Sequence, residues 1–104
     1  NSGSFFKNPV IPQAQFLELQ KRYPDMPHYS AGDDQEKIPA AYLIESCELK
    51  GYRIGAVGVH KGQPLVLVNY GGATGTELLA LARYVQEQVK KRFDILMEME
   101  VNVW

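Results

Sequence analysis

Residues 74–93 constrain the fold of this 104-residue chain more than any other stretch. Apolar side chains recur there at intervals of three and four, the period of one helix face: Leu78, Leu81, Ala82, Val85, Val89 and Phe93. Thr74 and Glu77 have the spacing of a capping box at the start of a helix. Cations at 90–92 stand in the last turn, where the helix dipole favours positive charge. The pattern predicts a long helix that buries one face in the core.

Two shorter helices are expected earlier in the chain. An apolar stripe predicts a helix over residues 13–23, and a second is expected over residues 38–49, with Pro39 near its first turn. Residues 24–37, between them, are rich in proline, glycine and acidic side chains. We expect this stretch to form a long loop, and loops of that length are often functional.

Strands are expected where branched and aromatic residues gather or alternate with polar ones, at 4–7, 52–60, 65–70 and 97–104. Residues 61–64 between the middle pair resemble a hairpin connection. The expected order is β-α-loop-α-β-β-α-β. We therefore predict an α+β fold, with a small sheet of about four strands covered by about three helices.

Composition limits the classes of function. A formal net charge of -1 gives no overall field that would attract nucleic acid or an anionic membrane. No apolar run approaches the ~20 residues needed to span a bilayer. Cys47 is the only cysteine, which argues against a disulfide framework and favours the cytoplasm. His28 and His60 are far apart in sequence, so no metal site is expected.

The residues by themselves leave the site open. Ser4 has no obvious histidine and aspartate partners, so a structural serine at a strand start is favoured over a nucleophile. Glu100 is typical of a solvated strand carboxylate, and Lys50 and Gln63 are typical of plain surface, with ligand binding as the alternative. The glycine-rich residues 71–76 lack the lysine of a P-loop and are expected to form a turn.

Several motifs, in order, resemble one enzyme family. GSFFKNP at residues 3–9 resembles the signature of the C-terminal domain of UDP-N-acetylenolpyruvoylglucosamine reductases. Residues 38–75 are similar to a further block of that family, with LKG, VH-x-x-Q and LVN in sequence. The ending MEMEVNVW resembles the family's terminal LEPEV strand, with Met99 in place of the proline. The resemblance covers essentially the whole chain.

The resemblance implies an activity. Enzymes of this family use NADPH and FAD to convert UDP-N-acetylglucosamine enolpyruvate to UDP-N-acetylmuramate for peptidoglycan synthesis. By this resemblance, residues 1–104 are the C-terminal substrate-binding domain of a larger flavoenzyme, whose FAD-binding domains are absent from this chain. Those domains would be its partner, and the chain alone is expected to be inactive. The alternative is a stand-alone module that binds a UDP-sugar or another nucleotide without catalysis.

The resemblance also assigns residues. Ser4 matches the family's proton donor, and Glu100 matches the glutamate that assists it. Asn8 matches a residue that contacts the substrate diphosphate. Contacts at the nucleotide are matched by Lys50, Gln63 and, in a looser alignment, Tyr29. No residue of the chain is expected to bind the cofactor.

Overall fold

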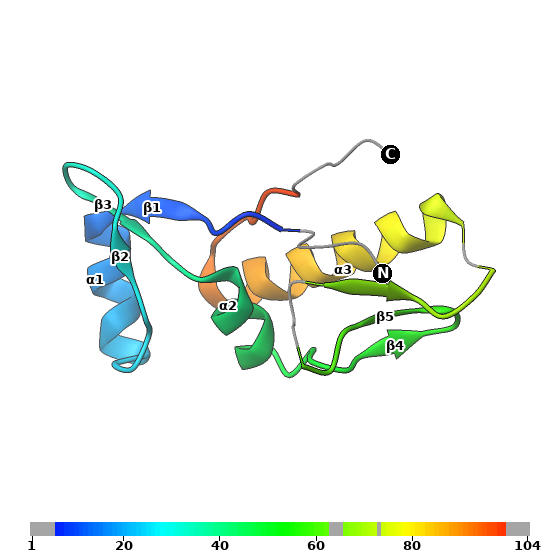
Figure 1. Cartoon of the computed structure of the whole chain (residues 1–104). Helices are drawn as coiled ribbons and strands as arrows, with labels where there is room; N and C mark the ends of the chain where they lie inside the picture. The colour runs from blue at the N-terminus through cyan, green and yellow to red at the C-terminus, as the bar shows by residue number, and fades with distance from the viewer. Residues whose placement is uncertain (1–5, 63–65, 73, 100–104) are drawn as a thin grey trace.

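The computed structural model describes residues 6–62, 66–72 and 74–99. These residues form helices and two three-stranded antiparallel sheets, of order β1-β3-β2 and β4-β5-β6. In Figure 1 the first sheet and α1 occupy one end of an elongated molecule, the second sheet and α3 the other, and α2 lies between. The elements, in chain order, are β1 (Val10–Pro12), α1 (Gln13–Arg22), β2 (Tyr29–Ser30), β3 (Gln35–Lys37), α2 (Ala40–Ser46), β4 (Arg53–Ile54), β5 (Val57–Val59), β6 (Leu67–Asn69) and α3 (Gly75–Phe93).

Helix α3 confirms the strongest prediction from the sequence. The Thr74 hydroxyl accepts a hydrogen bond from the Glu77 backbone N–H at 3.2 Å, and the Glu77 carboxylate accepts one from the Thr74 N–H at 3.3 Å. This reciprocal pair satisfies amides that would otherwise have no partner in the helix. The helix ends at Asp94, whose left-handed backbone (φ 57°) stops it. The α+β class is therefore confirmed, with a strand count that differs from the prediction.

The prediction of one strand over residues 52–60 was wrong. The chain turns at Gly55, whose φ of +58° suits glycine, and residues on either side pair as β4 and β5. Val57 and Val59 of β5 are buried, and β5 and β6 pack on α3. Because branched residues stand on both sides of a single glycine, this tight hairpin has the sequence pattern of one continuous strand.

The prediction of a loop over residues 24–37 was also wrong in part, because this stretch contains β2 and β3. Gly32 and Asp34 adopt positive φ values in the connection. Strand β3 is the central strand of its sheet, and β1 and β3 pack against α1. The polar composition hid these short strands, because only the middle residue of β3 is buried.

The first and last described segments of the chain meet. Phe6 forms an isolated antiparallel bridge with Met99, and the Lys7 N–H donates to the Glu98 carbonyl at 2.9 Å. Of the strand predicted over residues 4–7, residues 4 and 5 lie outside the described part of the chain, as do 100–104 of the last strand. The first regular strand begins later, at Val10. First and last segments are nevertheless neighbours, as two paired terminal strands would be.

A continuous core connects the two ends of the molecule. Phe93, at the end of α3, contacts the rings of Tyr23 after α1 and Tyr42 in α2, with centroids 4.8 and 6.5 Å apart. The side chain of Phe93 is only 1% exposed. None of the described helices combines the length and apolarity that crossing a membrane requires.

Candidate functional site

The segment Phe6 to Pro9 is held by two distant parts of the chain. Beyond the contacts of Phe6 and Lys7 with the last described residues, the Pro9 carbonyl accepts a hydrogen bond from the Ile38 N–H at 2.9 Å. Phe6 is 2% exposed and anchors the segment in the core. The backbone that carries the next side chains is therefore fixed by hydrogen bonds on both sides.

Asn8 has a structural bond that the sequence did not predict. Its Oδ1 accepts a hydrogen bond from the backbone N–H of Ala40, the first residue of α2, at 2.9 Å. The bond supplies one helix-start amide with an acceptor from another part of the chain. It also fixes which end of the side-chain amide is which. The donor end, Nδ2, is not used by this bond and can donate to an anionic ligand.

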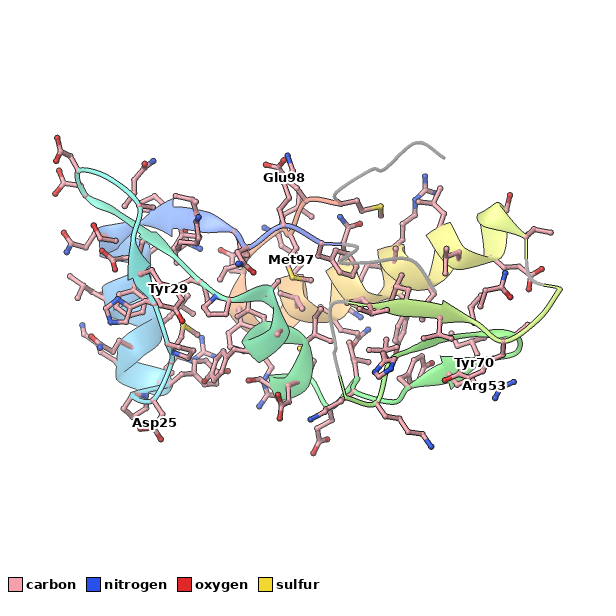
Figure 2. All side chains as sticks on the ribbon, viewed as in Figure 1. Asp25, Tyr29, Arg53, Tyr70, Met97 and Glu98 are labelled. Atoms are coloured by element: carbon pink, nitrogen blue, oxygen red, sulfur yellow. The ribbon has the colours of Figure 1, made fainter. Side chains whose placement is uncertain are left out.

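A groove of about 270 Å³ opens beside Asn8. Its lining comes from two segments: Lys7, Asn8, Pro9 and Val10 on one, Leu96 and Glu98 on the other. Figure 2 shows Glu98 pointing outward while its neighbour Met97, fully buried, points into the molecule. A cation and an amide donor suit an anionic group such as a diphosphate.

A second, open hollow lies on the other sheet. It measures about 450 Å³ and is lined by His60, Lys61, Val68 and Tyr70. The Arg53 guanidinium stacks on the Tyr70 ring at 3.9 Å, and both lie at the opposite end of the molecule from Tyr29 (Figure 2).

Gly58 makes this stacking possible. A Cβ on Gly58 would lie 3.1 Å from the Tyr70 ring and 3.0 Å from the Tyr52 carbonyl. Only glycine lets the Tyr70 ring lie this close to the sheet.

Lys50 lies at the far end of α2 from the groove. It follows the end of α2 and forms an ion pair with Glu45 at 3.7 Å, while Asn8 bonds the start of the same helix. A helix of seven residues is about 10 Å long, so the two predicted ligands lie at opposite ends of it. Next to Lys50, a Cβ on Gly51 would lie 3.3 Å from Lys61 Cγ.

The remaining predicted site residues divide into two groups. Tyr29 lies on β2 with its side chain 61% exposed, on the sheet whose β1 leads back to Asn8. Ser4, Gln63 and Glu100 lie outside the described residues.

Two features of the sheet β1-β3-β2 were not predicted from the sequence. The buried Glu36 carboxylate pairs with the His28 ring at 2.7 Å, but a hairpin turn separates the two in sequence and nothing local marked the pair. Lys37 lies beside Tyr29 in the sheet register, which the expected loop concealed.

Cys47 is not a candidate nucleophile. Burial raises the pKa of the Cys47 thiol, and the positive charge of Arg92 offsets this only in part. The thiol is therefore protonated near neutral pH. Among residues 6–62, 66–72 and 74–99, no cluster of histidine, cysteine and acidic side chains is arranged to hold a metal ion.

Comparison with protein families identifies the family of the chain. Residues 1–104 match the family described as UDP-N-acetylenolpyruvoylglucosamine reductase, C-terminal domain. The chain belongs to this family.

Similar proteins named UDP-N-acetylenolpyruvoylglucosamine reductase occur in several bacteria. The chain is 53% identical to the one from Chromobacterium violaceum over 100 residues, covering 96% of the chain and 29% of that protein. It is 50% identical to the one from Flavobacterium johnsoniae over 103 residues, which cover 99% of the chain and 31% of that protein. It is 52% identical to the one from Porphyromonas gingivalis strain ATCC 33277 over 102 residues, which cover 98% of the chain and 30% of that protein. The chain thus spans less than a third of these reductases, and the resemblance in its motifs is confirmed at the level of the family.

Proposed function

We propose that this chain is the substrate-binding and proton-donating domain of a UDP-N-acetylenolpyruvoylglucosamine reductase. The whole enzyme would reduce UDP-N-acetylglucosamine enolpyruvate to UDP-N-acetylmuramate in peptidoglycan synthesis, in the cytoplasm. Family membership and the similarity to reductases of that name support the proposal. The structural observation that carries it is the bridge between Phe6 and Met99.

That bridge joins the two segments on which the proposed catalytic residues lie. In sequence, Ser4 comes two residues before Phe6, and Glu100 comes directly after Met99. Reduction of the enolpyruvyl double bond adds a hydride to one carbon and a proton to its neighbour. In our proposal the Ser4 hydroxyl supplies that proton, and the Glu100 carboxyl group, in its protonated form, stabilises the negative charge that develops before the proton arrives.

The reducing chemistry belongs elsewhere in the enzyme. We assign the binding of FAD and NADPH to domains that lie outside this chain, because the chain spans less than a third of the reductases that it resembles. Those domains would be the chain's partner, and the chain alone should be inactive.

The substrate would lie along α2. The diphosphate would occupy the groove, with Asn8 Nδ2 donating to a phosphate oxygen and Lys7 supplying positive charge. Lys50 and Gln63 would contact the nucleotide. A nucleotide sugar is long and has chemically different ends, which suits contacts at both ends of α2.

Titration of the chain with UDP-N-acetylglucosamine, followed by NMR, tests this assignment. We expect shifts of backbone amides at Ala40, which bonds Asn8, and at Lys50. Amides of α1 residues such as Leu17, exposed on the far side of the first sheet, serve as the internal control. The absence of shifts at both Ala40 and Lys50, with ligand in excess, would contradict the proposal.

Variants of Asn8 should distinguish the structural role of its side-chain oxygen from the proposed ligand-binding role of its side-chain nitrogen. Asn8→Asp keeps an acceptor for the Ala40 N–H but loses the donor and brings negative charge to the groove, so we expect near-normal stability and weak UDP binding. Asn8→Ala loses both ends and should also lower the free energy of unfolding by about 1–2 kcal/mol. Urea unfolding and UDP titration measure the two effects. Normal UDP affinity in Asn8→Asp would remove Asn8 from the ligand site.

A further inference from the structure

Gln86 is a polar side chain in an otherwise apolar row of α3. Four residues lie along one side of this helix, at spacings of four, three and four: Ala82, Gln86, Val89 and Phe93. The three apolar members are buried, and Gln86 is half-buried among them. An amide in such a place needs a hydrogen-bond partner, because burying a polar group without one costs free energy.

The partner of Gln86 is the segment that follows the helix. Its Nε2 donates a hydrogen bond of 2.6 Å to the backbone carbonyl of Met97, eleven positions further along the chain. The Met97 side chain is fully buried, and that of Glu98, next to it, points outward (Figure 2). The bond therefore holds the backbone at position 97 directly against the middle of α3.

The residues after Met97 make the contacts with the beginning of the chain. The Glu98 carbonyl accepts a hydrogen bond from the Lys7 N–H at 2.9 Å, and Met99 forms the bridge with Phe6. Because residues 94–98 belong to no helix or strand, bonds from other elements fix the path of this segment.

Two glutamine side chains bond the segment, one near each end. Gln15 of α1 donates to the Asp94 carbonyl at 3.1 Å, and this bond is exposed. The bond of Gln86 is half-buried and lies two residues before the bridge at Met99. Of the two, the bond of Gln86 is at the end that leads to the proposed catalytic residues.

We propose that Gln86 is a positioning residue for the reduction step. Through the Met97 carbonyl it would set the place of the segment that leads to Glu100, opposite the segment that leads back to Ser4. This inference rests on the proposed function and adds to it a residue that touches no substrate. A displacement of about 1 Å at a reacting group can lower a rate by about 100-fold, so the loss of one bond here should lower kcat more than substrate binding.

Gln86→Met in the full-length enzyme tests the inference. Methionine has nearly the same length and cannot donate to the carbonyl. We expect kcat for UDP-N-acetylmuramate formation to fall about 10–100-fold, while KM for the enolpyruvate substrate hardly changes. NADPH oxidation with an artificial electron acceptor should stay normal. Gln15→Met is the matched control, because it removes the same kind of bond from the other end of the segment and should leave kcat unchanged.

Hydrogen exchange in the 104-residue chain, followed by NMR, is a readout that does not depend on activity. The Lys7 amide, which bonds the Glu98 carbonyl, should exchange about three- to tenfold faster in Gln86→Met, relative to the Leu81 amide in α3. Should Gln86→Met not fold, Gln86→Asn keeps the amide on a stem that is one carbon shorter, and we expect the same changes from it.

The outcomes that contradict the inference differ from those that contradict the proposed function. Equal falls of kcat in Gln86→Met and Gln15→Met would overturn the inference, because they would indicate general loss of the fold rather than of positioning. A normal kcat in Gln86→Met, or an unchanged relative exchange rate at Lys7, would also rule it out. In each case the proposed function would stand. Failure of the wild-type enzyme to form UDP-N-acetylmuramate would overturn both proposals.

Discussion

Ser4→Ala in the full-length enzyme is expected to lower the rate of UDP-N-acetylmuramate formation by about 10²–10⁴-fold, the usual contribution of a positioned general acid. The hydroxyl would be the proton source for the carbon next to the one that is reduced, and alanine has no proton to give. Because the change removes only one oxygen, the affinity for the UDP portion of the substrate should hardly change.

The measurement must separate this loss from general damage. NADPH oxidation with an artificial electron acceptor should continue at the normal rate in Ser4→Ala, while product formation fails. Ser2→Ala, which removes a hydroxyl two positions away, is the matched control and should retain product formation. Equal loss of NADPH oxidation and product formation would argue against proton donation by Ser4.

Phe93→Ala is expected to lower the free energy of unfolding by about 3–5 kcal/mol, the usual range for a buried phenylalanine. The side chain is 1% exposed and lies against Tyr23 and Tyr42, so its loss leaves a cavity where α1, α2 and α3 meet. Domains of this size are stable by about 5–15 kcal/mol, which makes the loss a large share of the total.

Urea denaturation followed by circular dichroism measures the effect of Phe93→Ala. Leu17→Ala is the control, because Leu17 is 50% exposed on α1 and should cost less than about 1 kcal/mol. Should Phe93→Ala not fold, Phe93→Leu keeps most of the volume and should give a smaller, measurable loss. A Phe93 variant as stable as the Leu17 control would show that this junction does not support the fold.

Elements with local causes were predictable from the sequence. The cap at Thr74, the apolar stripe of α3 and its cationic last turn all act within a few residues, and the structure reproduces the cap bond for bond. Strands with non-local causes were not predictable. Strand β3 exists because it pairs with β1 and β2 on both sides, and its own composition gives little sign of this.

The site divides in the same way. The family resemblance pointed to Asn8 and Tyr29 as site residues. Their surroundings, however, depend on contacts between distant segments. The bond from Ala40 to Asn8 joins residues on different elements, and the position of Lys37 beside Tyr29 follows only from strand register. No spacing in the sequence encodes either contact, so both are evident only in the folded structure.

The bridge between Phe6 and Met99 has a kinetic consequence. It closes a loop that contains nearly the whole chain, and the entropy cost of closing a loop rises with its length. Such contacts form late in folding, after local elements such as α3 have formed and the chain is compact. The groove is therefore among the last parts of the molecule to form, and a ligand bound in it would hold the first and last described segments together by mass action.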